Sequence, residues 1–159
     1  MKMLLYGILV VAALAVPTRT LELGKLKPVE VIRIDKAGEM IRIETDTGDS
    51  GKGGTVNQAI WDLQETTAGR VYLDTAEYIL LGADETVLNQ ISPYLKDAIR
   101  VCKCTGEIKL DETAGFLDVH RPKIKLKDYQ KGMELQVLEE ENGVLRLREK
   151  NIERREKTS

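Results

Sequence analysis

The sequence is poor in the residues from which most metal sites, disulfide scaffolds and nucleic-acid surfaces are built. Among 159 residues there are only one histidine, two cysteines, one tryptophan and one phenylalanine. A structural metal site needs about four ligands, and a small disulfide scaffold needs several cysteine pairs. Aromatic residues at 4% are too few to stack bases, and a net charge of -2 offers no basic surface for phosphates. The composition therefore argues against a typical metalloenzyme, a disulfide-stapled miniprotein and a nucleic-acid-binding protein.

Apolar residues, in contrast, are plentiful. They make up 42% of the chain. A chain of this length buries roughly 68–70% of the surface that it exposes when unfolded. The sequence is therefore long and apolar enough for one domain with a substantial core.

The N-terminal segment has a different character from the rest. Lys2 precedes an uncharged apolar run from Leu4 to Val16, which is shorter than the roughly 20 apolar residues of a membrane span. This pattern is typical of a secretory signal peptide at residues 1–15, with cleavage after Ala15; an uncleaved anchor is the alternative. We expect the remainder to be extracytoplasmic. No cysteine lies near the cleavage region, so membrane association is expected through partners and not through lipidation.

The region 28–148 is predicted to form a compact single α+β domain, between a lead-in segment at 16–27 and a charged tail at 149–159. Strands and helices interleave without clean βαβ repeats, which favours a mixed sheet packed by short helices. Asn142-Gly143 between alternating residues predicts a C-terminal β-hairpin. The expected strands are 28–35, 40–44, 71–81, 100–108, 123–126, 133–137 and 145–147.

Helices are predicted from capping residues and from apolar periodicity. Thr55 and Gln58 form a capping box for a helix whose apolar face is Val56, Ala59, Ile60 and Leu63. Further helices are expected at 84–90, from Ser92 onward and at 111–119. The buried side of the helix that begins at Ser92 is expected to consist of Tyr94, Leu95, Ala98 and Ile99.

The glycine-rich stretch 45–54 contains two short motifs, and is predicted to be a mobile loop. Gly48-Asp49-Ser50-Gly51 is similar to the sequence around a serine-protease nucleophile, but His120 is the only histidine that could serve as its base. Lys52 lies where a phosphate-binding loop has its lysine, but a glycine follows it in place of serine or threonine. We therefore expect a loop followed by a helix cap.

The cysteines and the histidine also have structural interpretations. Cys102 and Cys104 lie on one face of a predicted strand, where they are reduced buried thiols, or form a strained or intermolecular disulfide, or take part in redox or metal chemistry. His120 is expected at a helix end, where it interacts with the dipole. We predict no catalytic, cofactor-binding or metal-binding residue.

Trp61 is the one candidate partner-docking residue. At about 100° per residue, it projects almost opposite the apolar face of its helix. One interpretation is that a loop covers it, such as the lead-in at Leu21–Leu26; another is that it anchors a protein partner, because tryptophan is enriched at the energetic centres of interfaces.

An ordered set of features between residues 28 and 120 resembles a known family. A strand ends in Ile34-Asp35-Lys36, and Gly51-Lys52-Gly53-Gly54-Thr55 opens a helix. Tyr78 to Glu85 forms a strand closed by glycine and an acidic turn, and Ile91 to Leu95 leads to Arg100 and another strand. These features, in this order, resemble the N-terminal domain of the Ger(x)C (GerAC-like) family, the C subunits of bacterial spore germinant receptors.

The resemblance implies a non-enzymatic binding or scaffold module that acts in spore germination or sporulation, with protein partners such as membrane receptor subunits. An unrelated secreted domain that binds a peptide, glycan or small molecule is the alternative. A small hydrolase would depend on Ser50 alone.

Overall fold

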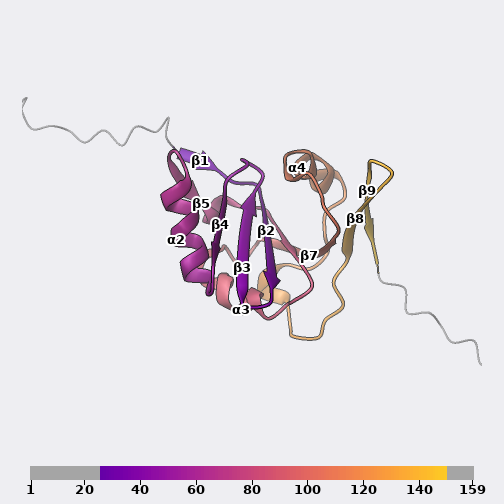
Figure 1. Cartoon of the computed structure of the whole chain (residues 1–159). Helices are drawn as coiled ribbons and strands as arrows, with labels where there is room; N and C mark the ends of the chain where they lie inside the picture. The colour runs from indigo at the N-terminus through magenta and orange to yellow at the C-terminus, as the bar shows by residue number, and fades with distance from the viewer. Residues whose placement is uncertain (1–25, 150–159) are drawn as a thin grey trace, which may run out of the picture.

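The computed structural model describes residues 26–149. The predicted signal peptide at 1–15 lies outside the described residues, as do nearly all of the lead-in segment at 16–27 and of the charged tail at 149–159. No helix within 26–149 is both long and apolar enough to cross a bilayer. The fold is α+β with a mixed sheet and a C-terminal hairpin, which confirms the predicted fold class (Figure 1).

A seven-stranded sheet forms the centre of the fold. Four neighbouring strands in its interior are parallel to one another. On both sides of these four, the sheet continues through strands that pair antiparallel with their neighbours. In spatial order the strands are β4 (Ser50–Gly53), β3 (Met40–Thr45), β2 (Val31–Ala37), β6 (Tyr78–Leu81), β7 (Arg100–Thr105), β8 (Val137–Glu141) and β9 (Val144–Arg148). A second, small sheet pairs β1 (Leu26–Pro28) with β5 (Arg70–Tyr72) in parallel.

Among residues 26–149, three α-helices cover the sheet. The larger apolar cluster contains residues of α2 (Val56–Thr66) and α3 (Val87–Ile91), whereas the smaller one contains residues of α4 (Leu110–Val119). The central strand β6 supplies both clusters, because successive side chains point to opposite faces. Ile79 and Leu81 belong to the larger cluster, and Tyr78 and Leu80 to the smaller one. The sheet is therefore buried on both faces at its centre.

The start of α2 confirms the predicted cap, with one change. The Thr55 hydroxyl accepts a hydrogen bond from the Gln58 amide at 3.2 Å. The Gln58 side chain reaches back to the amide of Gly54, at 3.0 Å, and not to that of Thr55. Two amides at the helix N-terminus are satisfied in this way.

Thr55→Ala is expected to reduce the free energy of unfolding by about 1 kcal/mol, because the Gln58 amide loses its acceptor. Thr55→Gly is expected to cost less. Urea denaturation midpoints of the two variants measure this difference. Two variants as stable as the wild type would show that the cap contributes nothing.

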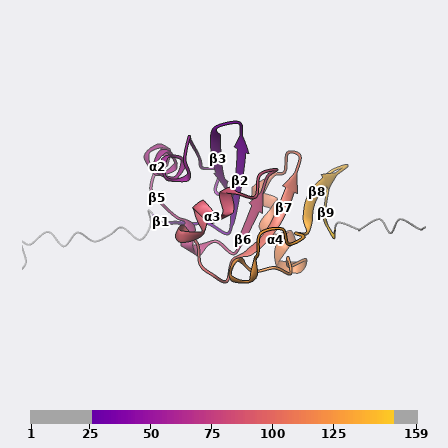
Figure 2. The same ribbon diagram turned by 90° about the horizontal axis from the view of Figure 1, so that it is seen from below.

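The expectation of a mobile loop over 45–54 is wrong for residues 50–53, which form strand β4. Its glycines are required by the close approach of α2: a Cβ on Gly51 would lie 2.2 Å from the Ala59 carbonyl oxygen. Side chains of α2 also contact the outer backbone of β4. Asp62 accepts from the Lys52 amide at 2.8 Å, and the Thr66 hydroxyl, whose one proton is also within reach of the Asp62 carbonyl at 2.8 Å, lies 3.3 Å from the Ser50 carbonyl. Residues 50–53 are thus an edge strand that α2 covers (Figure 1), and Figure 2 shows α2 at the same end of the sheet as β3.

Other boundaries also differ from those predicted. The strand expected at 71–81 is divided into β5 and β6 by a 3₁₀ turn at Leu73–Thr75, where the Thr75 hydroxyl bonds to the Val29 backbone. The helix expected at 84–90 begins only at Val87, because the Asp84 carboxylate accepts hydrogen bonds from Thr86 in the preceding turn.

The predictions after residue 91 are partly wrong. The helix expected from Ser92 is a single 3₁₀ turn, Ser92–Tyr94, and Tyr94 and Ala98 of its expected buried side are exposed. The strand expected at 123–126 is one bridge between Arg100 and Lys125, and β7 ends at Thr105. The first strand of the C-terminal hairpin begins at Val137.

The turn of the C-terminal hairpin is as predicted. Asn142 and Gly143 have φ angles of 54° and 75°, as a type I′ turn requires at both central positions. The β8–β9 register, with Glu141 opposite Val144, makes Asn142-Gly143 a two-residue loop.

Candidate functional site

Trp61 is the most exposed large aromatic side chain among the described residues. It lies in the middle of α2, and 69% of its surface is accessible. Val56, Ala59 and Leu63 on the other side of the helix are buried against the sheet. The predicted position of Trp61 on the outer face is therefore confirmed, and no other part of residues 26–149 covers its ring. The lead-in at Leu21–Leu26, which was the alternative cover, lies almost wholly outside the described residues.

Tyr94 lies on the same surface. Its hydroxyl donates a hydrogen bond to the Asn57 side chain. Asn57 and Trp61 are one turn apart on α2 and therefore lie on one side of the helix. Tyr94 is 38% exposed. We refer to Asn57, Trp61 and Tyr94 as the aromatic surface; the sequence pattern had assigned Tyr94 to the core.

Helix α2 holds this surface in a fixed position. Its first turn is capped by Thr55, and its middle packs on β4. At its C-terminal end the Gln64 amide group bonds twice to Val71 of β5, at 2.7 and 3.2 Å. Because both ends and the buried face of α2 are fixed, Trp61 is presented on a rigid element.

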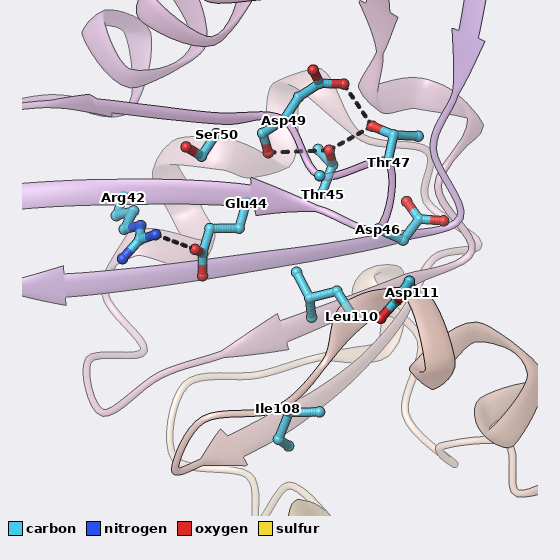
Figure 3. Close-up of a pocket in the computed structure, with 11 residues that line it drawn as sticks. Arg42, Glu44, Thr45, Asp46, Thr47, Asp49, Ser50, Ile108, Leu110 and Asp111 are labelled. Carbon is cyan, nitrogen blue, oxygen red and sulfur yellow. Dashed lines mark hydrogen bonds and ion pairs between the residues drawn. The ribbon is translucent and has the colours of Figure 1, made fainter.

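A polar groove of about 450 Å³ lies beside the loop between β3 and β4 (Figure 3). Thr45, Thr47 and Asp49 are hydrogen-bonded to one another on its upper side, and Ile108, Leu110 and Asp111 lie across from them. Burial raises the pKa of Asp49, but hydrogen bonds from Thr47 and Lys27 outweigh it and lower the pKa overall. These polar groups bond mainly to each other, and so they stabilise the loop.

In the described part of the chain no hydrogen bond joins the Ser50 hydroxyl to a basic side chain, although Glu44 lies opposite Ser50 on the neighbouring strand. Ser50 lies at the start of β4 at the rim of the groove, where its carbonyl is 3.3 Å from the Thr66 hydroxyl. His120 caps the C-terminal end of α4, and its ring centroid lies 4.6 Å from that of Phe116. The structure therefore does not bring Ser50 and His120 together as a nucleophile and its base.

Cys102 and Cys104 are free buried thiols that face the smaller apolar cluster. Burial raises the pKa of both thiols above their ordinary value. The thiolate, which is the reactive form, is therefore disfavoured at neutral pH. Within residues 26–149 no three His, Cys, Asp or Glu side chains are grouped to hold a metal ion.

Charged residues cluster where the parallel strands end. Ligands of open α/β sheets commonly bind just beyond the C-terminal ends of the parallel strands. Here, however, the charges pair with each other: Lys103 bonds to Glu85, and the Tyr129 hydroxyl donates to Glu85 at 2.6 Å. Burial, and then the bond to Glu85, raise the pKa of Tyr129 to about 12, so the hydroxyl keeps its proton. This cluster joins β6 and β7 to the segment before β8.

Glu85 is expected to make stability depend on pH. Hydrogen bonds from Lys103 and Tyr129 lower its pKa in the folded state. Its contribution is therefore present above the unfolded pKa, which is about 4.3, and is lost as the pH falls through the folded value. We expect Glu85→Gln to be less stable than the wild type at pH 7, and the difference to shrink below pH ~4. Urea unfolding across this range, with the exposed Glu65→Gln as control, measures it; a constant difference would contradict the prediction.

The comparisons with known proteins do not indicate a function for this chain. No protein-family model matches the chain. No curated protein and no solved structure gives a significant match. The function must therefore be inferred from the surfaces of the molecule and from its sequence motifs.

Proposed function

We propose that this chain is a non-enzymatic binding or scaffold module that docks protein partners outside the cytoplasm, with Trp61 as the anchor. The observation that carries the proposal is the exposed Trp61 ring on the rigid helix α2, with the half-exposed Tyr94 beside it. Tryptophan and tyrosine dominate the energetics of protein interfaces. A side chain on a fixed element loses little conformational freedom when it binds, which favours affinity.

The sequence supports the setting of this function. The signal peptide predicted at residues 1–15 supports an extracytoplasmic location. The resemblance of residues 28–120 to the N-terminal domain of the Ger(x)C family supports a role in spore germination or sporulation. On this basis the partners are subunits of a membrane-bound germinant receptor.

Fluorescence of Trp61 tests the exposed state directly, because it is the only tryptophan in the chain. We expect red-shifted emission that iodide quenches in the free protein, and a blue shift on partner binding. Emission that is blue-shifted and resists quenching in the monomeric free protein would remove Trp61 from the candidate contacts.

Affinity purification from sporulating cells tests the docking role. Trp61→Ala is expected to lose the receptor subunits that the wild type retains, while stability changes by no more than about 0.5 kcal/mol. Val119→Ala is the matched control, because Val119 is a 76% exposed apolar residue on α4. Equal retention by Trp61→Ala and the wild type, or equal loss from both variants, would contradict the proposal.

A further inference from the structure

The two edge strands of the seven-stranded sheet, β4 and β9, differ in whether their outward backbone groups have hydrogen-bond partners. At β4, the Asp62 side chain accepts from an outward amide of the strand, and the Thr66 hydroxyl lies against an outward carbonyl. At β9, no strand or helix of residues 26–149 continues the sheet (Figure 1). Strand β9 is therefore the open edge.

The hairpin determines which backbone groups of β9 are free. Its two-residue loop makes Glu141 and Val144 the first hydrogen-bonded pair, and bonded and non-bonded pairs alternate along an antiparallel ladder. The N–H and C=O groups of Leu145 and Leu147 consequently point away from β8. In the described part of the chain no other backbone group bonds to them.

The side chains of β9 give this edge two distinct faces. Arg146 and Arg148 lie on the solvent face, with side chains that are 52% and 53% exposed. Leu145 and Leu147 are half-buried on the other face, where they pack against the smaller apolar cluster. An added strand would meet arginines on one side and leucines on the other.

Strand β8 shows which residues suit this pattern. Its Glu141 lies 3.1 Å from the guanidinium of Arg146, and its Glu139 lies 2.7 Å from that of Arg148. Its Leu138 is opposite Leu147 and fully buried. On the arginine face β8 thus places Glu139 and Glu141 together with Val137, and on the leucine face it places Leu138 opposite Leu147 and Glu140 opposite Leu145.

We propose that the β9 edge binds an extended segment of another protein in which acidic and apolar residues alternate. The segment pairs with the backbone of Leu145 and Leu147 as an eighth strand. Its acidic side chains contact Arg146 and Arg148 from the outer side, and its apolar side chains extend the leucine face. This surface is separate from the aromatic surface on α2, and the inference does not depend on Trp61.

Charge disfavours a second copy of this chain as the occupant. Antiparallel pairing of two β9 strands must place their outward residues, Leu145 and Leu147, opposite each other. A two-fold axis at Arg146 would oppose two arginines, and an axis at Leu147 would oppose Arg146 and Arg148. Like charges directly opposite are destabilising. An axis at Leu145 avoids this, but it pairs Arg148 with a turn residue, Asn142.

A labelled peptide of four Glu-Val repeats, titrated into the full chain and followed by fluorescence anisotropy, tests the proposal. We expect saturable binding that is about tenfold tighter than that of four Lys-Val repeats. Hydrogen exchange should slow at the amides of Leu145 and Leu147. No binding up to about 1 mM, equal binding of both peptides, or protection elsewhere would overturn the proposal. A wild-type dimer that the peptide dissociates would assign the edge to a second copy instead.

Two variants at one position separate strand addition from simple apolar contact. Leu147→Pro removes an outward N–H while the donors that face β8 remain, and proline is tolerated on such an edge. Leu147→Ala keeps the N–H. We expect the proline variant to bind the Glu-Val peptide at least about tenfold more weakly than the alanine variant. Equal affinities would contradict strand addition. If the proline variant fails to fold, the exchange pattern of the wild type decides.

Discussion

Gly51→Ala is expected to reduce the free energy of unfolding by about 3 kcal/mol or more. The new Cβ would lie 2.2 Å from the Ala59 carbonyl oxygen and 2.4 Å from the Leu63 amide nitrogen. Both are backbone atoms of α2, which cannot move aside as the end of a flexible side chain can. The helix must therefore separate from β4 and expose the apolar contact between them.

Gly115→Ala is the matched control for Gly51→Ala. A Cβ at Gly115 meets no atom within 4 Å, and the residue lies within α4. Alanine is the better helix former, so this variant is expected to gain about 0.5–1 kcal/mol. Denaturant unfolding of both variants measures the difference. A Gly51→Ala protein of wild-type stability would show that α2 does not pack closely on β4.

Leu80→Ala is expected to cost about 2–5 kcal/mol. Leu80 lies in the central strand β6, is fully buried and belongs to the smaller apolar cluster beneath α4. Truncation removes apolar contacts and leaves a cavity, because its neighbours on β2 and β7 are held by the ladder.

Val119→Ala serves as the comparison for Leu80→Ala. It removes apolar atoms from an exposed position and should change stability by less than about 0.5 kcal/mol. Urea midpoints with unchanged slopes measure both effects. Similar midpoints for the two variants would contradict the burial of Leu80 in a close-packed core.

Local signals in the sequence predicted the parts of the fold that short-range chemistry controls. Asn142-Gly143 specifies its turn because both residues tolerate positive φ, and Thr55 specifies the start of α2 because its hydroxyl serves the Gln58 amide. The glycines of 45–54 were misinterpreted as a sign of mobility. Their reason is tertiary, since Gly51 and Gly53 lack side chains where α2 crosses the strand.

The candidate surfaces were predictable to different degrees. Helical periodicity alone placed Trp61 on the outer face of α2. Tyr94 was assigned to the core because a helix was expected from Ser92, whereas one 3₁₀ turn directs its hydroxyl toward Asn57. The alternation of 145–147 indicated a strand, but its position at the edge depends on the order of all seven strands.

The seal that α2 places on β4 also limits what the molecule can assemble into. Polymerisation through sheets requires each subunit to offer two free edges, one to receive a strand and one to pass the pattern on. Here Asp62 and Thr66 cover one of them. Within residues 26–149, a subunit that gains a strand at β9 by the proposed contact has no second open edge of this sheet to offer, which disfavours growth of the sheet into a fibre.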